Sequence, residues 1–208
     1  MNTFIYKLWA DIFNILRWIS IFQYVRFLPF AKSHGFVELW VLSNTFLAFI
    51  VYLSNKIYES GWWSVLFICY GFLRVFEIII YQINVVFFDE FRAEQKGLNY
   101  AVKSYKRILI LLLHNYVEII LWFASSYLVL YPHFQVAYND TVFNAIYASF
   151  RVTTNLGLDS VEALTNLGRN LLWVQSISGL LMTIISIARF INVLPIPDTD
   201  DPTEKSKK

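Results

Sequence analysis

Cysteine and charge are both scarce in this sequence of 208 residues. The single cysteine, Cys69, lies in an apolar run, so the chain cannot form an intrachain disulfide and carries no cysteine-based metal or redox motif. Charged residues make up 15% of the chain and hydrophobic residues 57%, whereas soluble domains average about 25% and about 45–50%. This composition argues against an ordinary soluble domain and indicates a membrane protein.

Motifs of enzymes and of nucleic-acid-binding proteins are also missing. No apolar run carries a metal-ligand cluster, a nucleophile with its base, or a phosphate-binding loop. His114 and Glu118 lie four residues apart, but one such pair is a weak signal for a metal or catalytic site. The net charge is only +2, and basic residues do not interleave with aromatic ones as on a nucleic-acid-binding surface. We therefore expect no enzyme, no metal or cofactor, and no direct nucleic-acid partner.

Four long apolar runs are present instead, at about residues 37–54, 63–88, 108–131 and 171–194. Each is long enough for roughly 20 residues to cross a hydrocarbon core of about 30 Å. An amphipathic stretch at 3–28 precedes them, with apolar residues on one face and several charges on another. This pattern predicts an interfacial helix that ends at Pro29, although a soluble-style helix packed on its neighbours has the same pattern.

Basic residues are distributed unevenly among the connecting segments. The amino-terminal segment, the loop 89–107 and the carboxyl-terminal tail carry most of them, whereas the first outer loop has only Lys56. The positive-inside rule therefore places both termini and the 89–107 loop in the cytoplasm, in agreement with an even number of spans. We expect a multi-pass protein of the plasma (inner) membrane, in contact with the lipid bilayer. Its expected parts are an interfacial helix (1–31), two spans with a basic loop (32–107), a second pair of spans (108–195) and a disordered tail (196–208).

Ionisable residues occur near the middle of two apolar runs. Arg74 and Glu77 are three residues apart, and His114 and Glu118 are four apart, so each pair shares a helix face. Ionisable residues inside a membrane indicate a functional site by default. Opposite charges on adjacent spans can also neutralise each other and fix the register of a bundle. We favour structural pairing of Arg74 with Glu77 or Glu118 over an ion or proton path.

The segment between the third and fourth apolar runs is much longer than two antiparallel helices need. Residues 141–153 within it are apolar but too short to span, which indicates a re-entrant or interfacial helix with Asp140 and Thr141 at its amino-terminal cap. Irregular backbone at membrane depth is tolerated only where protein buries it or a water-filled cavity receives it. The pattern therefore predicts a pore loop, in which the helix enters the membrane and the tract 153–159 (TTNLGLD) returns from it.

The order of these segments resembles the pore module of tetrameric potassium channels. Thr153 and Thr154 match the paired threonines of their filter, and Asp159 matches its closing aspartate. The run 167–169 (LGR) matches a leucine-glycine-arginine that often begins the inner helix. The resemblance covers about residues 108–194. It implies an all-α membrane fold in which four copies surround a central axis, each with four transmembrane helices and a re-entrant pore helix.

The filter-like tract departs from the family pattern at four positions. Counting from Thr154, the usual valine, glycine, tyrosine and glycine are replaced by Asn155, Leu156, Gly157 and Leu158. Potassium filters aim successive carbonyls at the ion, in backbone conformations that glycine reaches without steric cost and leucine does not. A left-handed backbone costs roughly 1–2 kcal/mol per non-glycine residue, so two leucines in four subunits sum to about 8–16 kcal/mol. The tract argues against a four-site potassium filter, but not against the pore fold.

Other residues have expected places in such a pore. Arg151 would lie behind the filter, paired with Asp159 or Glu162 of the same or a neighbouring subunit, unless it snorkels to the surface. Asp159 and Glu162 would ring the outer mouth. A stripe of small residues on the inner helix indicates either the pore face or close helix packing, and its glycine lies near the usual hinge position. The stripe consists of Ser176, Gly179, Thr183 and Ser186.

Two functions fit these observations. The first is a homotetrameric channel that passes monovalent cations with weak selectivity or only when triggered, with Thr154, Asn155 and Gly157 lining its narrowest part. The alternative is a non-conducting, channel-derived sensor or scaffold, in which the loop plugs the axis. Its cytoplasmic segments 89–107 and 198–208 would then recruit a soluble partner, by analogy with membrane components of bacterial phage defence.

Overall fold

The computed structural model describes residues 4–58, 61–97, 99, 104–136, 143–157, 159–191 and 193. The described chain is mostly helical. Its α-helices are α1 (Phe4–Leu16), α2 (Ile21–Val25), α3 (His34–Ile57), α4 (Trp62–Ile83), α5 (Asp89–Gln95), α6 (Tyr105–Val129), α7 (Asn144–Thr153) and α8 (Asn166–Ile191). Short helical segments are η1 (Arg17–Ile19), η2 (Pro29–Lys32), η3 (Asn84–Phe88) and η4 (Tyr131–His133), and two strands are β1 (Phe134–Val136) and β2 (Val161–Ala163).

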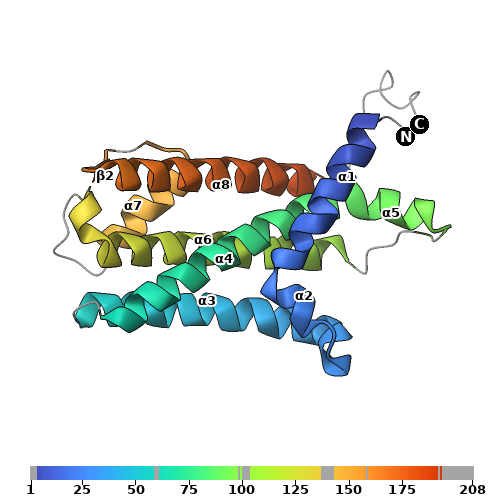
Figure 1. The fold of residues 1–208 in the computed structure, drawn as a ribbon, viewed down its shortest axis with the longest axis horizontal. Coiled ribbons are helices and arrows are strands. Elements are labelled where there is room, and N and C mark those ends of the chain that lie inside the picture. Colours follow the sequence, from blue (N-terminus) through green and yellow to red (C-terminus); the bar gives the residue numbers. More distant parts are fainter. Residues whose placement is uncertain are drawn as a thin grey trace, which may run out of the picture.

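Four helical stretches are long and apolar enough to cross a membrane, which confirms the four predicted spans. Three of them lie in α3, α6 and α8, and Figure 1 shows these helices running along the long axis of the molecule while α4 crosses them obliquely. The second stretch, Trp62–Gln95, is longer than predicted. The π-helical segment η3 joins α4 to α5 without a break, so residues 89–95 are helical where the sequence predicts the start of a loop.

The amino-terminal segment is helical, but it is not the continuous helix that its amphipathic pattern predicts. Ser20 is extended, with φ −70° and ψ 128°, and separates η1 from α2. Its hydroxyl accepts a hydrogen bond from the Gln23 N–H at 3.4 Å, which satisfies one of the free N–H groups at the start of α2. This cap turns the chain, so that α1 and α2 cross the bundle near the end that holds α5 (Figure 1).

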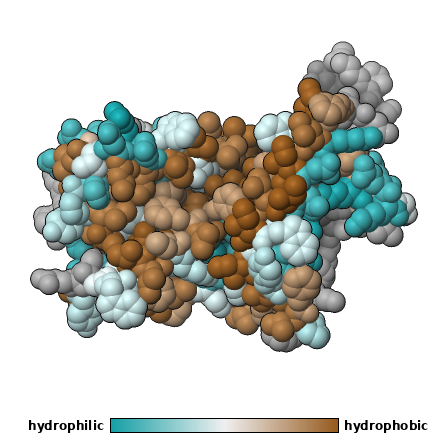
Figure 2. Space-filling view, viewed as in Figure 1, coloured by the Kyte–Doolittle hydropathy of each residue, from teal (hydrophilic) through white to brown (hydrophobic). Residues whose placement is uncertain are grey.

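Hydrophilic residues gather at that same end of the molecule, whereas hydrophobic residues cover the flank of the bundle (Figure 2). α1 is attached there by aromatic packing. Ala10 of α1 is buried with Phe88 and Phe91, and the Tyr6 and Phe13 rings pack against the same group. A polar end next to an apolar flank is the distribution expected of a helical bundle in a bilayer.

α6 is the central helix of the bundle. Its apolar side chains are buried against α3, α4 and α8 in one core, which contains Ala48, Val51, Val75, Ile78, Leu112, Ile119, Trp122, Phe123, Met182 and Ile185. Gly71 of α4 allows the close approach of α6, because a Cβ at this position would lie 2.7 Å from Cδ2 of Trp122. The same central helix also contacts α7, so α6 connects the bundle to the candidate site.

The strands β1 and β2 form an antiparallel pair, with Phe134 opposite Ala163 and Val136 opposite Val161. Phe134 and Val161 are buried together with Tyr127 and Leu172. The sequence analysis missed this pair, since strands of three residues are too short to show a periodic pattern. The pair joins the two ends of the segment that contains α7, and so holds this segment between α6 and α8.

Candidate functional site

α7 is the short helix expected between the third and fourth spans, and it packs between α6 and α8 (Figure 1). It begins at Asn144, and the predicted cap residues Asp140 and Thr141 lie outside the described residues. Ala148 and Val152 of α7 are buried in the cluster that includes Leu172 of α8. The helix is therefore positioned by apolar contacts with both neighbours.

A buried glutamine of α8 joins these three helices by hydrogen bonds. Gln175 donates from Nε2 to Thr153 Oγ1 at 2.8 Å and to the Ser149 carbonyl at 3.0 Å, and its Oε1 accepts from the Tyr127 hydroxyl. Ser149 in turn donates to the Ile120 carbonyl at 2.7 Å. Because Gln175 has no exposed surface, these partners satisfy a polar group that would otherwise be costly to bury. The sequence analysis missed Gln175, although an amide side chain within an apolar run indicates a buried residue that needs hydrogen-bond partners.

The end of α7 is held at a second point by α6 and α8. The Tyr116 hydroxyl donates to the Thr153 carbonyl at 3.1 Å and also bonds to Thr183 Oγ1 at 2.9 Å. Gly179 lies directly against Thr153, since a Cβ at this glycine would be 2.7 Å from the Thr153 carbonyl carbon. Thr153 is thus fixed from three sides.

The predicted stripe on α8 is therefore divided between two environments. Gly179 and Thr183 face α7 and α6 of the same chain. Ser176 and Ser186 are half-buried, and the Ser186 hydroxyl donates to the Met182 carbonyl of its own helix at 2.7 Å. Close helix packing accounts for Gly179, while a pore-facing role of the stripe stays a prediction.

The filter-like loop begins as a compact turn. The Asn155 N–H donates to the Val152 carbonyl at 3.1 Å, and the Leu156 N–H donates to the Arg151 carbonyl at 2.9 Å. Asn155 and Gly157 have positive φ angles of 58° and 121°. Asparagine and glycine tolerate this region best, so the steric penalty that a potassium-type filter would place on Leu156 does not arise here. Leu158 lies outside the described residues.

Arg151 braces this turn from within the same chain. Its guanidinium binds both carboxylate oxygens of Asp159, at 2.6 and 2.7 Å, and also donates to the Leu156 carbonyl at 3.1 Å. The guanidinium carbon lies 5.7 Å from the centre of the Tyr147 ring. Of the two predicted partners the structure places Asp159 against Arg151. Hydrogen bonding to this carboxylate raises the pKa of Arg151 above its usual range, so the residue stays cationic.

The two predicted mouth residues face one open hollow. Asp159, Glu162 and Ser176 line it together with Arg169 and Trp173, and its volume is about 660 Å³. Glu162 lies on β2, opposite Gln135 of β1, and its side chain is exposed. The short sheet therefore sets the position of one carboxylate of this hollow, while Arg151 sets the position of the other.

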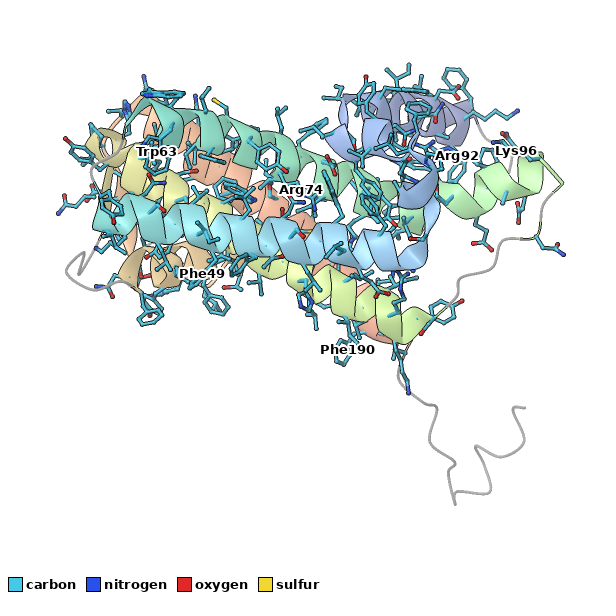
Figure 3. The ribbon with its side chains drawn as sticks, turned by 90° about the horizontal axis from the view of Figure 1, so that it is seen from below. Phe49, Trp63, Arg74, Arg92, Lys96 and Phe190 are labelled. Carbon is cyan, nitrogen blue, oxygen red and sulfur yellow. The ribbon has the colours of Figure 1, made fainter. Side chains whose placement is uncertain are left out.

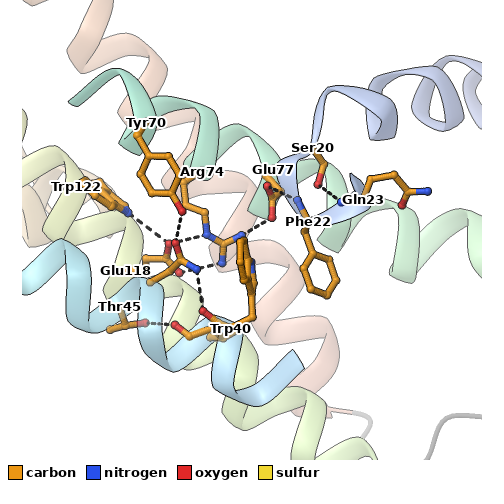
Figure 4. A network of polar contacts seen from close by, with 12 residues as sticks. Ser20, Phe22, Gln23, Trp40, Thr45, Tyr70, Arg74, Glu77, Glu118 and Trp122 are labelled. Atoms are coloured by element: carbon orange, nitrogen blue, oxygen red, sulfur yellow. Dashed lines mark hydrogen bonds and ion pairs between the residues drawn. The ribbon is translucent and has the colours of Figure 1, made fainter. Parts of the chain in front are cut away.

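A separate buried cluster contains the intramembrane charges (Figure 4). Arg74 donates from Nε to Glu118 at 2.9 Å and from Nη1 to Glu77, and all three side chains are almost fully buried. Trp122 Nε1 donates to Glu118 at 3.3 Å, and the backbone N–H of Phe22 donates to Glu77 at 3.3 Å. The cluster links α2, α4 and α6, and Figure 3 places Arg74 midway along the bundle.

The remaining candidate pair, His114 and Glu118, is not brought together. His114 is half-buried, with Nδ1 2.9 Å from the Ile110 carbonyl, whereas Glu118 turns inward to Arg74. Within the described part of the chain, no group of three or more histidine, cysteine or acidic side chains is placed to hold a metal ion.

The comparisons with known proteins agree with this geometry. Residues 116–195 match the family described as Ion channel. The match begins within α6 and includes α7, the filter-like loop, β2 and α8. Neither the curated proteins nor the solved structures gave a match. Residues 116–195 are therefore similar to the pore module of the ion-channel family, within a protein whose four apolar helices are those of a multi-pass membrane protein.

Proposed function

We propose that four copies of the chain form a channel for monovalent cations that is weakly selective or opens only when triggered. In this proposal α7 is the re-entrant pore helix, and Thr154, Asn155 and Gly157 line the narrowest part of the axis. One observation carries the proposal: the segment that matches the ion-channel family contains a short helix fixed between two spans, with an irregular loop at its end. Such a loop needs a protein or water environment at membrane depth, which an axial pore supplies.

Weak selectivity is supported by how the carbonyls of the loop are used. A potassium filter directs successive carbonyl oxygens at the ion in place of its hydration shell. In this chain the Thr153 carbonyl accepts from Tyr116, and the Leu156 carbonyl accepts from Arg151. Two oxygens of the tract are thus engaged within the protomer. The exposed residues Asn155 and Gly157 remain to line the axis, with a hydrated ion as the better fit.

The outer hollow would concentrate cations at the mouth. Asp159 is paired with Arg151, and the hollow also holds the cationic Arg169, so Glu162 is the carboxylate of the hollow that no ion pair among the described residues neutralises. Repeated in four subunits, such a ring attracts cations most strongly at low ionic strength, where screening is weak.

The experiment is single-channel recording of the purified protein in planar bilayers, together with a mass measurement of the detergent-solubilised complex. We expect four copies and cation currents. Glu162→Gln should reduce the conductance at low salt and change it little at high salt, because salt screens surface charge. Glu94→Gln is the matched control, since Glu94 is also exposed, forms no ion pair among the described residues and lies on α5 outside the hollow. A conductance unaffected by Glu162→Gln at low salt would remove Glu162 from the mouth.

The alternative function is a non-conducting sensor or scaffold, and the same hydrogen bonds favour it. If the engaged carbonyls keep the turn closed, the loop acts as a plug, and a soluble partner would bind the cytoplasmic segments. Tetramers that give no current under any condition would support this alternative. Deleting residues 196–208 should then abolish binding of the partner, whereas a channel would keep its conductance after this deletion.

A further inference from the structure

A second cavity lies away from the pore module, under the amino-terminal helices. Its volume is about 300 Å³, and it is enclosed by α2, α3, α4 and α6 near the end of the bundle where α5 lies. Arg17 and Arg26 contribute to its lining from the amino-terminal segment. The proposed pore uses no part of this cavity.

Three amide oxygens in this lining are buried without a hydrogen-bond partner among the described residues. They belong to Gln82, Asn84 and Asn115, whose side chains are 3%, 1% and 4% exposed. The orientation of Asn84 is fixed, because its Nδ2 donates to the Ile80 carbonyl at 2.8 Å and its Oδ1 is therefore the free acceptor. Buried polar atoms almost always have partners, so three unpaired acceptors in one cavity indicate a ligand that donates hydrogen bonds.

The charges around the cavity favour an anion. Two of its arginines, Arg74 and Arg107, are paired with glutamates, and the carboxylate of Asp89, which also lines the cavity, is paired with Arg92. Arg17 and Arg26 form no ion pair within the part of the chain that the structure describes, and Nε of Arg17 is buried without a partner. Guanidinium groups match the geometry of phosphate oxygens and bind them by paired hydrogen bonds.

We propose that this cavity binds a phosphate ester that also carries hydroxyl groups. The phosphate lies at Arg17 and Arg26, and the hydroxyls donate to the amide oxygens of Gln82, Asn84 and Asn115. The same chemistry occurs in a lipid headgroup and in a soluble phosphate ester. The lining also includes the apolar side chains of Ile108 and Leu111, which would contact the start of an acyl chain if the ligand is a lipid.

Binding is tested by native mass spectrometry of the full chain in detergent, with phosphatidylglycerol or phosphatidylcholine added. Both lipids carry phosphate, but only phosphatidylglycerol carries a net charge and hydroxyl donors. We expect phosphatidylglycerol to bind about tenfold more tightly, or better, a difference that such measurements resolve. The double substitution Arg17→Gln and Arg26→Gln should abolish this preference. The matched control, Lys7→Gln with Lys106→Gln, removes two exposed cations outside the cavity and should keep it.

A second variant separates loss of the ligand from loss of the fold. Asn115→Leu removes one unpaired acceptor, so it should weaken phosphatidylglycerol binding several-fold without lowering the melting temperature of the ligand-free protein. Glycerol 3-phosphate is then added as a competitor of phosphatidylglycerol. If it displaces the lipid, the cavity accepts soluble phosphate esters. If it does not displace the specifically bound lipid, the ligand is the lipid headgroup. Equal binding of the two lipids to the unaltered chain would contradict the proposal, as would equal losses in the two double variants.

Discussion

Arg74 shows at the scale of one residue how a charge is kept inside this bundle. Its guanidinium is shared by Glu77 and Glu118, and none of the three side chains has appreciable contact with solvent. Desolvating three charges is expensive, so the cluster persists only because each group has a partner. Its contribution lies in fixing how α4 and α6 face each other, and less in net stability.

Removing Arg74 alone should therefore be more damaging than removing the whole cluster. Arg74→Leu leaves two carboxylates buried without their cation, and loss of one partner of a buried pair costs about 3–5 kcal/mol. The triple variant Arg74→Leu, Glu77→Leu and Glu118→Leu replaces the cluster by apolar groups and should melt at a higher temperature than the single variant. Thermal melting of the three proteins in one detergent measures this difference. A single variant as stable as the unaltered chain would show that the cluster has no structural role.

The ion pair between Arg151 and Asp159 holds the filter-like loop, and we expect the two residues to act as a unit. Arg151→Gln and Asp159→Asn should each change the single-channel conductance, and the double variant should differ little from either single one. Arg92→Gln is the control, because it removes an arginine that is likewise paired with an aspartate, Asp89, but lies on α5 outside the hollow. Additive effects of the two substitutions would show that they act separately.

At the scale of elements, the contact between α7 and α8 depends on the absence of a side chain at Gly179. Alanine is a better helix former than glycine by about 1 kcal/mol, so propensity alone favours Gly179→Ala. The new Cβ would, however, overlap the backbone of Thr153, and overpacking of this kind costs about 1–3 kcal/mol. We expect the steric term to prevail, with a lower melting temperature. Gly35→Ala is the control, since a Cβ there meets nothing within 4 Å.

The outcome for Gly179→Ala also separates packing from hinge function. A melting temperature equal to or above that of the unaltered chain would mean that α8 can move away from Thr153 at no cost. In that case the glycine would be free to serve as the hinge that the family resemblance implies.

The sequence predicts the elements whose signal extends over many residues. The four spans follow from apolar runs, because crossing a bilayer needs about 20 such residues. The break in the amino-terminal helix at Ser20 is not predicted, because a single capping residue interrupts an amphipathic pattern that is otherwise continuous. The π-helical segment η3 and the three-residue strands are also too short to leave a periodic pattern in the sequence. At the site, residue types predicted that Arg151 would need an acidic partner, but only the folded chain places Asp159 against it and Gln175 beneath α7.

At the scale of the whole molecule, the proposed pore requires more than one copy of the chain. The loop residues Asn155 and Leu156 are exposed, and so is a row of apolar side chains on α8, namely Trp173, Ile177, Leu180, Ile184 and Ile187. Symmetric repetition around an axis would give the loop a water-filled environment and would cover part of this apolar face.

The central proposal is that this axis conducts cations without a potassium filter. The most direct test is the reversal potential of single channels with potassium chloride on one side of the bilayer and an equal concentration of sodium chloride on the other. Because the Thr153 and Leu156 carbonyls are engaged within the chain, we expect a reversal potential close to zero. A large reversal potential of the sign that corresponds to potassium permeating much better than sodium would contradict the account, since it would require carbonyls free to replace the hydration shell of the ion.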